Sequence, residues 1–321
     1  RSENLTKNPK ELKNSLRRMH WDDLKTKYGL PCRDVPPKLL NDKNIFFGGR
    51  RIWRDKQRTS TISPNADGIA MGLLHTGAHY SDALSDSNII YDFPNTENPS
   101  TDAGEISSVK NAHYLELPLF VVSKSTLRSK VRNVHLGWVE SWDDENEVFL
   151  ITFSEEAVHS AADDDEQENE FELKSTNKPE KQTQSIARPD QQKFRFEVFK
   201  RYKYKVDGET KCALTGLPVN DLLDAAHLYP KSKNGNDNPR NGLPLSPTVH
   251  RALDKGLIGI CPDDFSIHGD LEVLDQLGIQ YRDLNHLRKK PAPEALNYLW
   301  NIFEKAKKTN CPTPSTLSLA R

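Results

Sequence analysis

Four residues whose side chains can bind metal ions or move protons lie within the stretch 227–254: His227, Asn241, His250 and Asp254. His250 and Asp254 are four positions apart, so on a helix they would share one face. An imidazole and a carboxylate on one helical face are a suitable pair of ligands for a hard or borderline divalent cation. The stretch therefore predicts a metal site carried partly by a helix.

A strand and a loop would position the first two of these residues. Leu222–Tyr229 is a mainly apolar run, which is consistent with a buried strand, and His227 lies near its end. The stretch 231–240 has the Asn, Gly, Ser and Pro content of a loop, and Asn241 closes it.

Helix signals frame the other two residues. Ser246 and Pro247 suit the N-cap and first position of a helix, and Gly256 suits its C-terminal cap. The short helix between them carries His250 and Asp254, so the predicted order is strand, polar loop and helix.

This order resembles the HNH, or ββα-metal, endonuclease family. The motifs that carry the resemblance are AAH ending at His227, NGLPLS beginning at Asn241, and HRALD from His250 to Asp254. From His227 the offsets are 14, 23 and 27 residues to the other three. The resemblance implies a nuclease domain in which Asn241 braces the loop and so supports the geometry of the catalytic site.

Phosphodiester hydrolysis needs a nucleophilic water and neutralisation of charge on the phosphate. Neutral imidazole, which titrates near about pH 6.5, can accept the proton of that water, so His227 is the predicted general base. One Mg2+- or Mn2+-like ion would act as the Lewis acid. Its predicted ligands are His250 and Asp254, with Asp224 as a third candidate. Many relatives carry a ligand directly before the base, where this chain has Ala226.

Each residue also has a simpler interpretation. A single histidine on an apolar strand, such as His227, is usually a core residue, and His250 with Asp254 could form a surface pair of small energetic value. The agreement of three separate motifs in order favours the nuclease interpretation.

Composition limits the class of protein. At 321 residues, with 35% hydrophobic and 28% charged residues, the chain has the length of two soluble domains. No apolar run is long enough for a membrane-spanning helix, so no membrane association is expected. The four cysteines form no CxxC pair, which predicts a reducing, cytoplasmic environment and no structural zinc site.

The net charge of −1 conceals two segments of opposite sign. Residues 140–170 contain 13 acidic and no basic residues, whereas 193–211 contain seven Lys or Arg and three acids. Attraction to phosphate is local, so a basic face can still bind DNA. The predicted contacts to the DNA backbone are Arg50, Arg51, Arg54, Lys193, Arg195, Lys200 and Arg201. Each of the last four could equally be a solvated charge on the surface of a helix.

The N-terminal segment predicts a helix. Asn8, Pro9 and Glu11 suit its first turn. The apolar residues on one side are Leu12, Leu16 and Met19, and the basic residues mostly on the other are Lys13, Arg17 and Arg18. We expect the apolar side to pack and the basic side to face solvent, in preference to a DNA-contacting arm.

Short β-rich runs follow and predict a β-barrel or sandwich, interrupted by one helix at Ala103–Glu116. The runs are Ile45–Trp53, Asp67–His75, Asn88–Phe93, Leu117–Val122, His135–Glu140 and Val148–Phe153. Beyond them, helices are predicted from Pro189 and from Pro293.

The region 37–160 resembles the SRA domain, a module that recognises modified cytosine in DNA. The resemblance rests on HTGAHYSDALSDSNIIYDFPNT at 75–96 and on LPLFVV at 117–122. Gly77, Tyr80, Asp82 and Tyr91 fit the pocket pattern of that family. The glycine-rich segment usual after the second tyrosine is replaced here by Asp92, Phe93 and Pro94.

The resemblance implies a flipped base held in a pocket, because a 5-methyl group is invisible to phosphate contacts. Tyr80 and Tyr91 would stack on the base. Asp82 would accept a hydrogen bond from the cytosine amino group, with Asp92 in reserve. The alternative is that each tyrosine is a core residue of the β domain.

The sequence therefore predicts an α+β chain. Its parts are an N-terminal helical segment at 1–36, an SRA-like barrel or sandwich at 37–160, a flexible acidic linker at 161–188, and an HNH domain with flanking helices at 189–321.

The expected function is cleavage of double-stranded DNA that carries 5-methylcytosine or a related base. Because one HNH site attacks one strand, we expect a homodimer or pairing on DNA. The alternatives are an HNH nuclease that reads unmodified DNA and a catalytically inactive binder of modified DNA.

Overall fold

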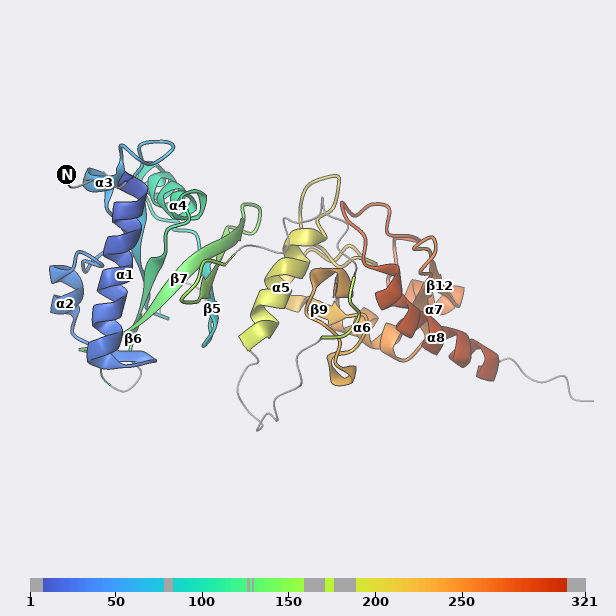
Figure 1. The fold of residues 1–321 in the computed structure, drawn as a ribbon. Helices are drawn as coiled ribbons and strands as arrows, with labels where there is room; N and C mark the ends of the chain where they lie inside the picture. The colour runs from blue at the N-terminus through green and yellow to red at the C-terminus, as the bar shows by residue number, and fades with distance from the viewer. Residues whose placement is uncertain are drawn as a thin grey trace, which may run out of the picture. The chain divides into compact units, whose positions relative to one another are not determined.

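The computed structural model describes residues 8–77, 83–125, 128, 130–158, 171–175 and 189–310. The chain divides into two compact units, Arg1–Ala161 and Ala162–Arg321, called here the N-terminal and C-terminal units (Figure 1). Among the described residues, no helix combines the length and the apolarity needed to cross a membrane.

The N-terminal unit contains an eight-stranded mixed sheet. Its strands run in the order β2-β3-β6-β7-β8-β5-β4, with β1 also paired to β7, and β3 and β6 are parallel. The strands are β1 Cys32–Val35, β2 Ile52–Arg54, β3 Ala70–His75, β4 Ala83–Leu84, β5 Asn88–Asp92, β6 Leu119–Lys124, β7 Arg132–Asp143 and β8 Val148–Phe153. In the described part of the chain no strand pairing closes this sheet. The α+β class is confirmed, but among the described residues the sheet is open and the expected barrel or sandwich is not shown.

Most predicted strands are present, but Ile45–Trp53 is not one long strand. Only β2 forms there, because the backbone before it crosses closely over β3 instead of pairing with it. A Cβ atom on Gly72 would lie 2.2 Å from the carbonyl oxygen of Ile45, so glycine is required at this crossing. Ile45 itself is fully buried.

Helices cover both faces of the sheet, as the alternation of residues along β6 shows (Figure 1). Phe120 and Val122 belong to a core with Trp21 and Leu24 of α1, whereas Leu119 and Val121 belong to a core with Val109 and Ala112 of α4. Successive side chains of a strand point to opposite faces, so α1 and α4 lie on opposite sides of the sheet. The helices of this unit are α1 Pro9–Tyr28, α2 Pro37–Asp42, α3 Lys56–Thr59 and α4 Pro99–Tyr114.

The helix α1 begins where predicted, and the side chain of Asn8 accepts a hydrogen bond from the backbone N–H of Lys10 at its N-cap. Its predicted packing face, however, is wrong. Leu12 and Met19 are 53% and 52% exposed, whereas Arg17, which was expected on the solvated side, is 2% exposed.

Arg17 is buried because it binds the ends of two parallel strands. Its Nη1 atom donates hydrogen bonds to the carbonyl oxygens of Ala70, 2.9 Å away, and Pro118, 2.5 Å away. These residues lie at the start of β3 and directly before β6. The guanidinium therefore satisfies carbonyl groups that the sheet leaves unpaired.

The C-terminal unit is built around an antiparallel strand pair followed by a helix. Its elements are α5 Pro189–Arg201, η1 Asn220–Leu222, β9 Asp224–His227, η2 Lys231–Lys233, η3 Pro239–Asn241, β10 Gly242–Leu245, α6 Pro247–Asp254, β11 Ile258–Ile260, β12 Ile267–Gly269, α7 Leu271–Gln276 and α8 Pro293–Asn310. The helices predicted from Pro189, Pro247 and Pro293 are all present, and His227 ends its strand as predicted.

Part of the expected linker packs against this unit. The backbone N–H of Ser175 donates to the carbonyl of Asn234 over 2.9 Å, and Lys174 forms a β-bridge with Gly235. The guanidinium of Arg240 lies 5.0 Å from the ring centre of Phe171. Residues 171–175 are thus attached to the polar loop and are not free linker, while 161–170 and 176–188 lie outside the described residues.

Candidate nuclease site

The predicted nuclease residues lie on a strand pair, β9–β10, and on the helix α6 that follows it. Asp224 and His227 are on β9, and His250 and Asp254 are on α6. In the antiparallel pairing, Gly242 is opposite His227 and Leu245 is opposite Asp224. The helix α6 begins two residues after Leu245, so the chain turns back over β9. Residues at both ends of the strand are therefore placed by this ββα arrangement.

His227 is held in a defined orientation by α5 and by the polar loop. Its ring stacks on Phe194 of α5, with ring centres 3.9 Å apart and planes 14° from parallel. Its Nε2 atom lies 2.9 Å from Oδ1 of Asp237. When Nε2 carries the proton donated to Asp237, Nδ1 has the free lone pair that a general base needs.

Asp237 was not predicted as a site residue. Burial alone would raise the pKa of its carboxyl group, but hydrogen bonds from His227 and Lys231 hold that pKa below the ordinary range. Lys231 donates from Nζ to Oδ2, the second carboxylate oxygen. Asp237 is therefore ionised at neutral pH and orients the imidazole of His227. In the sequence it is one more polar residue of a polar loop, and only its place ten residues after His227 could have suggested the contact.

Asn241 is fully buried and joins the two ends of the polar loop. Its Nδ2 atom donates to the carbonyl oxygens of Tyr229 and Asn236, each 3.0 Å away. Its Oδ1 atom accepts from the backbone N–H of Tyr229 over 2.8 Å. These contacts are to backbone groups, so in this structure the side chain fixes the loop on which Asp237 lies.

The three predicted metal ligands gather around the imidazole of His250. Its Nδ1 atom lies 3.2 Å from Oδ2 of Asp224, and its Nε2 atom lies 3.7 Å from Oδ2 of Asp254. All three side chains are partly exposed, so a cation with its water could reach them. Asp224, the third candidate in the sequence, is the carboxylate nearer to His250.

The donor chemistry of this group fits one hard or borderline divalent cation, since it offers two carboxylates and one imidazole. Among the described residues, however, no group of three His, Cys, Asp or Glu side chains is already arranged to hold a metal ion. In this structure the carboxylates are instead directed at the two nitrogen atoms of His250.

The basic residues predicted on α5 are largely engaged within the C-terminal unit. Arg195 donates to the carbonyl oxygens of Leu223 and Asn220, next to β9, and burial lowers its pKa. Arg201 donates to the carbonyl of Lys290 over 3.1 Å. The two lysines of α5, Lys193 and Lys200, are partly exposed. Lys193 lies 4.0 Å from Glu197. The two arginines therefore hold this unit together.

The predicted base-binding residues of the N-terminal unit are only partly described, since Tyr80 and Asp82 lie outside the described residues. Tyr91 of β5 is fully buried, and its hydroxyl lies within hydrogen-bond distance of two backbone carbonyls, of Arg51 and of Leu74. The guanidinium of Arg51 covers its ring at 4.2 Å. The structure therefore places Tyr91 in the core, where its ring is not open to a base.

The basic cluster near β2 surrounds a buried carboxylate. Burial raises the pKa of Glu105, which is 6% exposed, and the charges of Arg50, Arg54 and Arg51 oppose that rise. Arg54 also lies 3.7 Å from Asp67. Arg51 donates to the backbone carbonyl of Asp92, the residue expected as a reserve base contact. Arg51 and Arg54 thus have roles inside the N-terminal unit, while Arg50 is exposed.

Among comparisons with known proteins, the match to a protein family agrees with the ββα geometry. No curated protein matches the chain. Among solved structures, the chain is similar to a modification-dependent TagI restriction endonuclease, at 14% identity over 88% of this chain and 94% of that one, with a TM-score of 0.29. A similarity at that level does not establish a shared fold. The model of the HNH endonuclease family matches residues 212–261, which include β9, the polar loop, β10 and α6. Residues 212–261 therefore form an HNH endonuclease domain.

Proposed function

We propose that the chain is a metal-dependent DNA endonuclease that acts on modified DNA. The HNH domain would cut the phosphodiester bond, and the N-terminal unit would select DNA with 5-methylcytosine or a related base. The single observation that carries the nuclease part is the ββα group itself. It places an oriented imidazole at the end of β9 and an imidazole between two carboxylates at α6.

In this proposal His227 accepts the proton of the attacking water at Nδ1, because Nε2 is held by Asp237. The stack on Phe194 keeps the ring from rotating out of line. A divalent cation, when bound, supplies positive charge to the scissile phosphate and the leaving oxygen. His250, Asp224 and Asp254 would hold it, and Asn241 keeps the loop in place.

Recognition of the modified base is the part of the proposal supported by the sequence resemblance. Tyr80 and Asp82 remain its proposed contacts. Tyr91 is not proposed, because its ring is buried. An HNH nuclease that reads unmodified DNA is the second candidate, and the burial of Tyr91 and the open sheet favour it.

One assay tests both parts. Matched duplexes that carry C, 5-methylcytosine, 5-hydroxymethylcytosine or 6-methyladenine are incubated with Mg2+, Mn2+ or a chelator, and nicks are counted on each strand. The proposal expects metal-dependent cleavage that is strongest on the 5-modified cytosines. Equal cleavage of all four duplexes would support the second candidate.

The role of His227 has its own control. Substitution of a general base usually lowers the rate about 100- to 10,000-fold, so His227→Ala should abolish most cleavage. His268→Ala is the matched variant, because His268 is exposed on β12 and has no part in the ββα group. Retention of metal-dependent nicking by His227→Ala would refute the assignment of the base.

Two-copy action is tested in the same assay by the dependence of double-strand cutting on protein concentration.

A further inference from the structure

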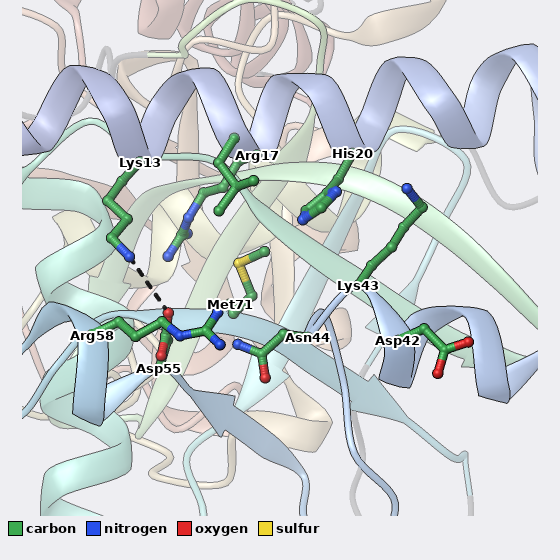
Figure 2. Close-up of a pocket in the computed structure, with 10 residues that line it drawn as sticks. Lys13, Arg17, His20, Asp42, Lys43, Asn44, Asp55, Arg58 and Met71 are labelled. Atoms are coloured by element: carbon green, nitrogen blue, oxygen red, sulfur yellow. Dashed lines mark ion pairs between the residues drawn. The ribbon is translucent and has the colours of Figure 1, made fainter. Parts of the chain in front are cut away.

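A polar cavity of about 250 Å³ lies in the N-terminal unit, beneath α1. Figure 2 shows its polar side chains approaching from two sides. Those from α1 are Lys13, Arg17 and His20. Opposite them are Asn44 and Asp55, from the segment between α2 and α3, and Arg58 of α3. This cavity belongs to a different unit from the HNH domain and has no role in the proposed cleavage.

Arg17 is the most buried charge of the cavity lining. Nη1 is occupied by its two backbone carbonyls, whereas Nε and Nη2 have no hydrogen-bond partner among the described residues. Burial lowers the pKa of Arg17 to about 10, so the group still carries a full charge at neutral pH. A desolvated guanidinium with unused donors favours an anion strongly.

The two lysines of the lining already have acidic partners. Lys13 lies 3.8 Å from Asp55, and Lys43 lies 2.7 Å from Asp23. The carboxylate of Asp55 thus lies beside Lys13, and its negative charge also raises the pKa of Arg17. The lysines add positive potential but are not the groups with free binding capacity.

The two arginines have no such partner. Within the described part of the chain, no carboxylate lies within ion-pair distance of Arg17 or of the exposed Arg58. The remaining carboxylate of the lining, Asp42, is exposed on α2. Of the four basic groups of the lining, the two lysines are thus paired with carboxylates, and the two arginines are not.

Two neutral polar side chains also line the cavity. The Nδ1 atom of His20 is buried and has no hydrogen-bond partner among the described residues. Burial and the charge of Lys43 lower the pKa of His20, which keeps the ring neutral at pH 7 and able to donate from one nitrogen. The carboxamide of Asn44 also has no partner in the described chain and lines the same cavity.

We propose that this cavity binds a phosphate monoester, with Arg17 and Arg58 as its charged contacts and His20 and Asn44 as neutral donors. A planar guanidinium with several N–H donors matches the oxygen atoms of a phosphate. Two unpaired positive charges match a dianion, which a monoester is near neutral pH, better than a carboxylate. The phosphate is carried either by a small molecule such as a nucleotide or by the 5′ end of a DNA strand.

The test uses the full chain in the presence of a chelator, at constant ionic strength. Inorganic phosphate and deoxyadenosine 5′-monophosphate are titrated, and binding is followed by calorimetry and by the melting temperature. We expect saturable binding at one site per chain. Arg58→Gln removes one charge-assisted hydrogen bond and should weaken binding about tenfold.

Two further variants assign the binding to the cavity. Arg33→Gln, which changes an exposed arginine of β1 in the same unit, should bind as wild type does. Asn44→Asp places a carboxylate in the cavity and should abolish binding. Asn44 has a φ of 53°, a left-handed conformation that aspartate also tolerates, so the fold is retained. Absence of saturable binding, or equal affinities of Arg58→Gln and Arg33→Gln, would overturn the proposal.

The source of the phosphate is identified by competition. Two duplexes of one sequence, one with a 5′-phosphate and one with a 5′-hydroxyl, are added against the bound nucleotide. Displacement by the phosphorylated duplex alone identifies a DNA end, and displacement by neither identifies a small molecule. Displacement by both duplexes to the same extent shows general attraction to DNA and contradicts a monoester site.

Discussion

The HNH site and the cavity beneath α1 both gather charged side chains, but they differ in sign and in how the chain assembles them. At the HNH site, two carboxylates lie near His250, and we propose that this group binds a cation. In the cavity, two arginines have no carboxylate partner among the described residues, and we propose that this group binds an anion. The HNH residues lie within one short stretch, whereas Arg17 is fixed by residues 53 and 101 positions away. Local spacing therefore predicts the first site and is silent on the second.

The largest expected effect is on the cation side of this comparison. His250→Ala removes the imidazole between Asp224 and Asp254, so we expect cleavage to fall about 1,000-fold and Mn2+ binding to weaken in a chelator-free titration. His268→Ala is again the control. Unchanged Mn2+ affinity in His250→Ala would contradict the assignment of the metal site.

The next effect is on the anion side and concerns folding. Arg17→Ala leaves the carbonyls of Ala70 and Pro118 without their donor, and hydrogen bonds to a charged group are worth about 1.5–3 kcal/mol. We expect the N-terminal unit to lose about 3 kcal/mol of unfolding free energy in urea. Met19→Ala, at an exposed position of the same helix, should cost less than about 0.5 kcal/mol. Similar losses in both variants would mean that Arg17 does not hold the strand ends.

A smaller effect tests whether α5 orients the base. A Cβ atom on Gly242 would lie 2.6 Å from Val198 and 2.7 Å from Phe194, the residue that stacks on His227. Gly242→Ala should therefore cost about 2 kcal/mol through overpacking and also lower the cleavage rate. Gly48→Ala, where a Cβ meets nothing within 4 Å, is the matched control. Full activity in Gly242→Ala would show that the stack is dispensable.

The smallest effect is a dependence of stability on pH. The pKa of Asp237 is lower in the folded chain than its ordinary value of 3.8, so its ionised form stabilises the fold. This contribution is complete above about pH 4 and is lost as the pH falls through the lower, folded-state value. The difference in melting temperature between wild type and Asp237→Asn should thus be largest near neutral pH and should shrink below pH 4. A difference that is constant with pH would exclude a charged role for Asp237.

The sequence predicts those features whose signals are short-range. The N-cap at Asn8, the helix start at Ser246 and Pro247, and the motif spacing at His227 place helices and strands within a few residues of their observed bounds. The apolar residues Leu12 and Met19 predict the wrong buried face for α1. The buried face is instead the one that carries Arg17, which binds two carbonyl groups far away in the sequence.

Contacts between segments far apart, or between polar groups of one loop, carry no comparable signal. The shortening of the predicted strand at Ile45 depends on its crossing over Gly72, and the choice of Asp237 depends on how the loop folds around Asn241. The open sheet has the same origin, since the resemblance was carried by local motifs and closure depends on how the end strands meet.

The attachment of residues 171–175 has a mechanical consequence. This short strap is bonded to Asn234 and Asn236, and Asp237 is the next residue along the chain. A displacement of residues 171–175 would therefore act directly on the loop that carries Asp237. Asp237, whose carboxylate orients His227, thus lies on the loop to which residues 171–175 are bonded.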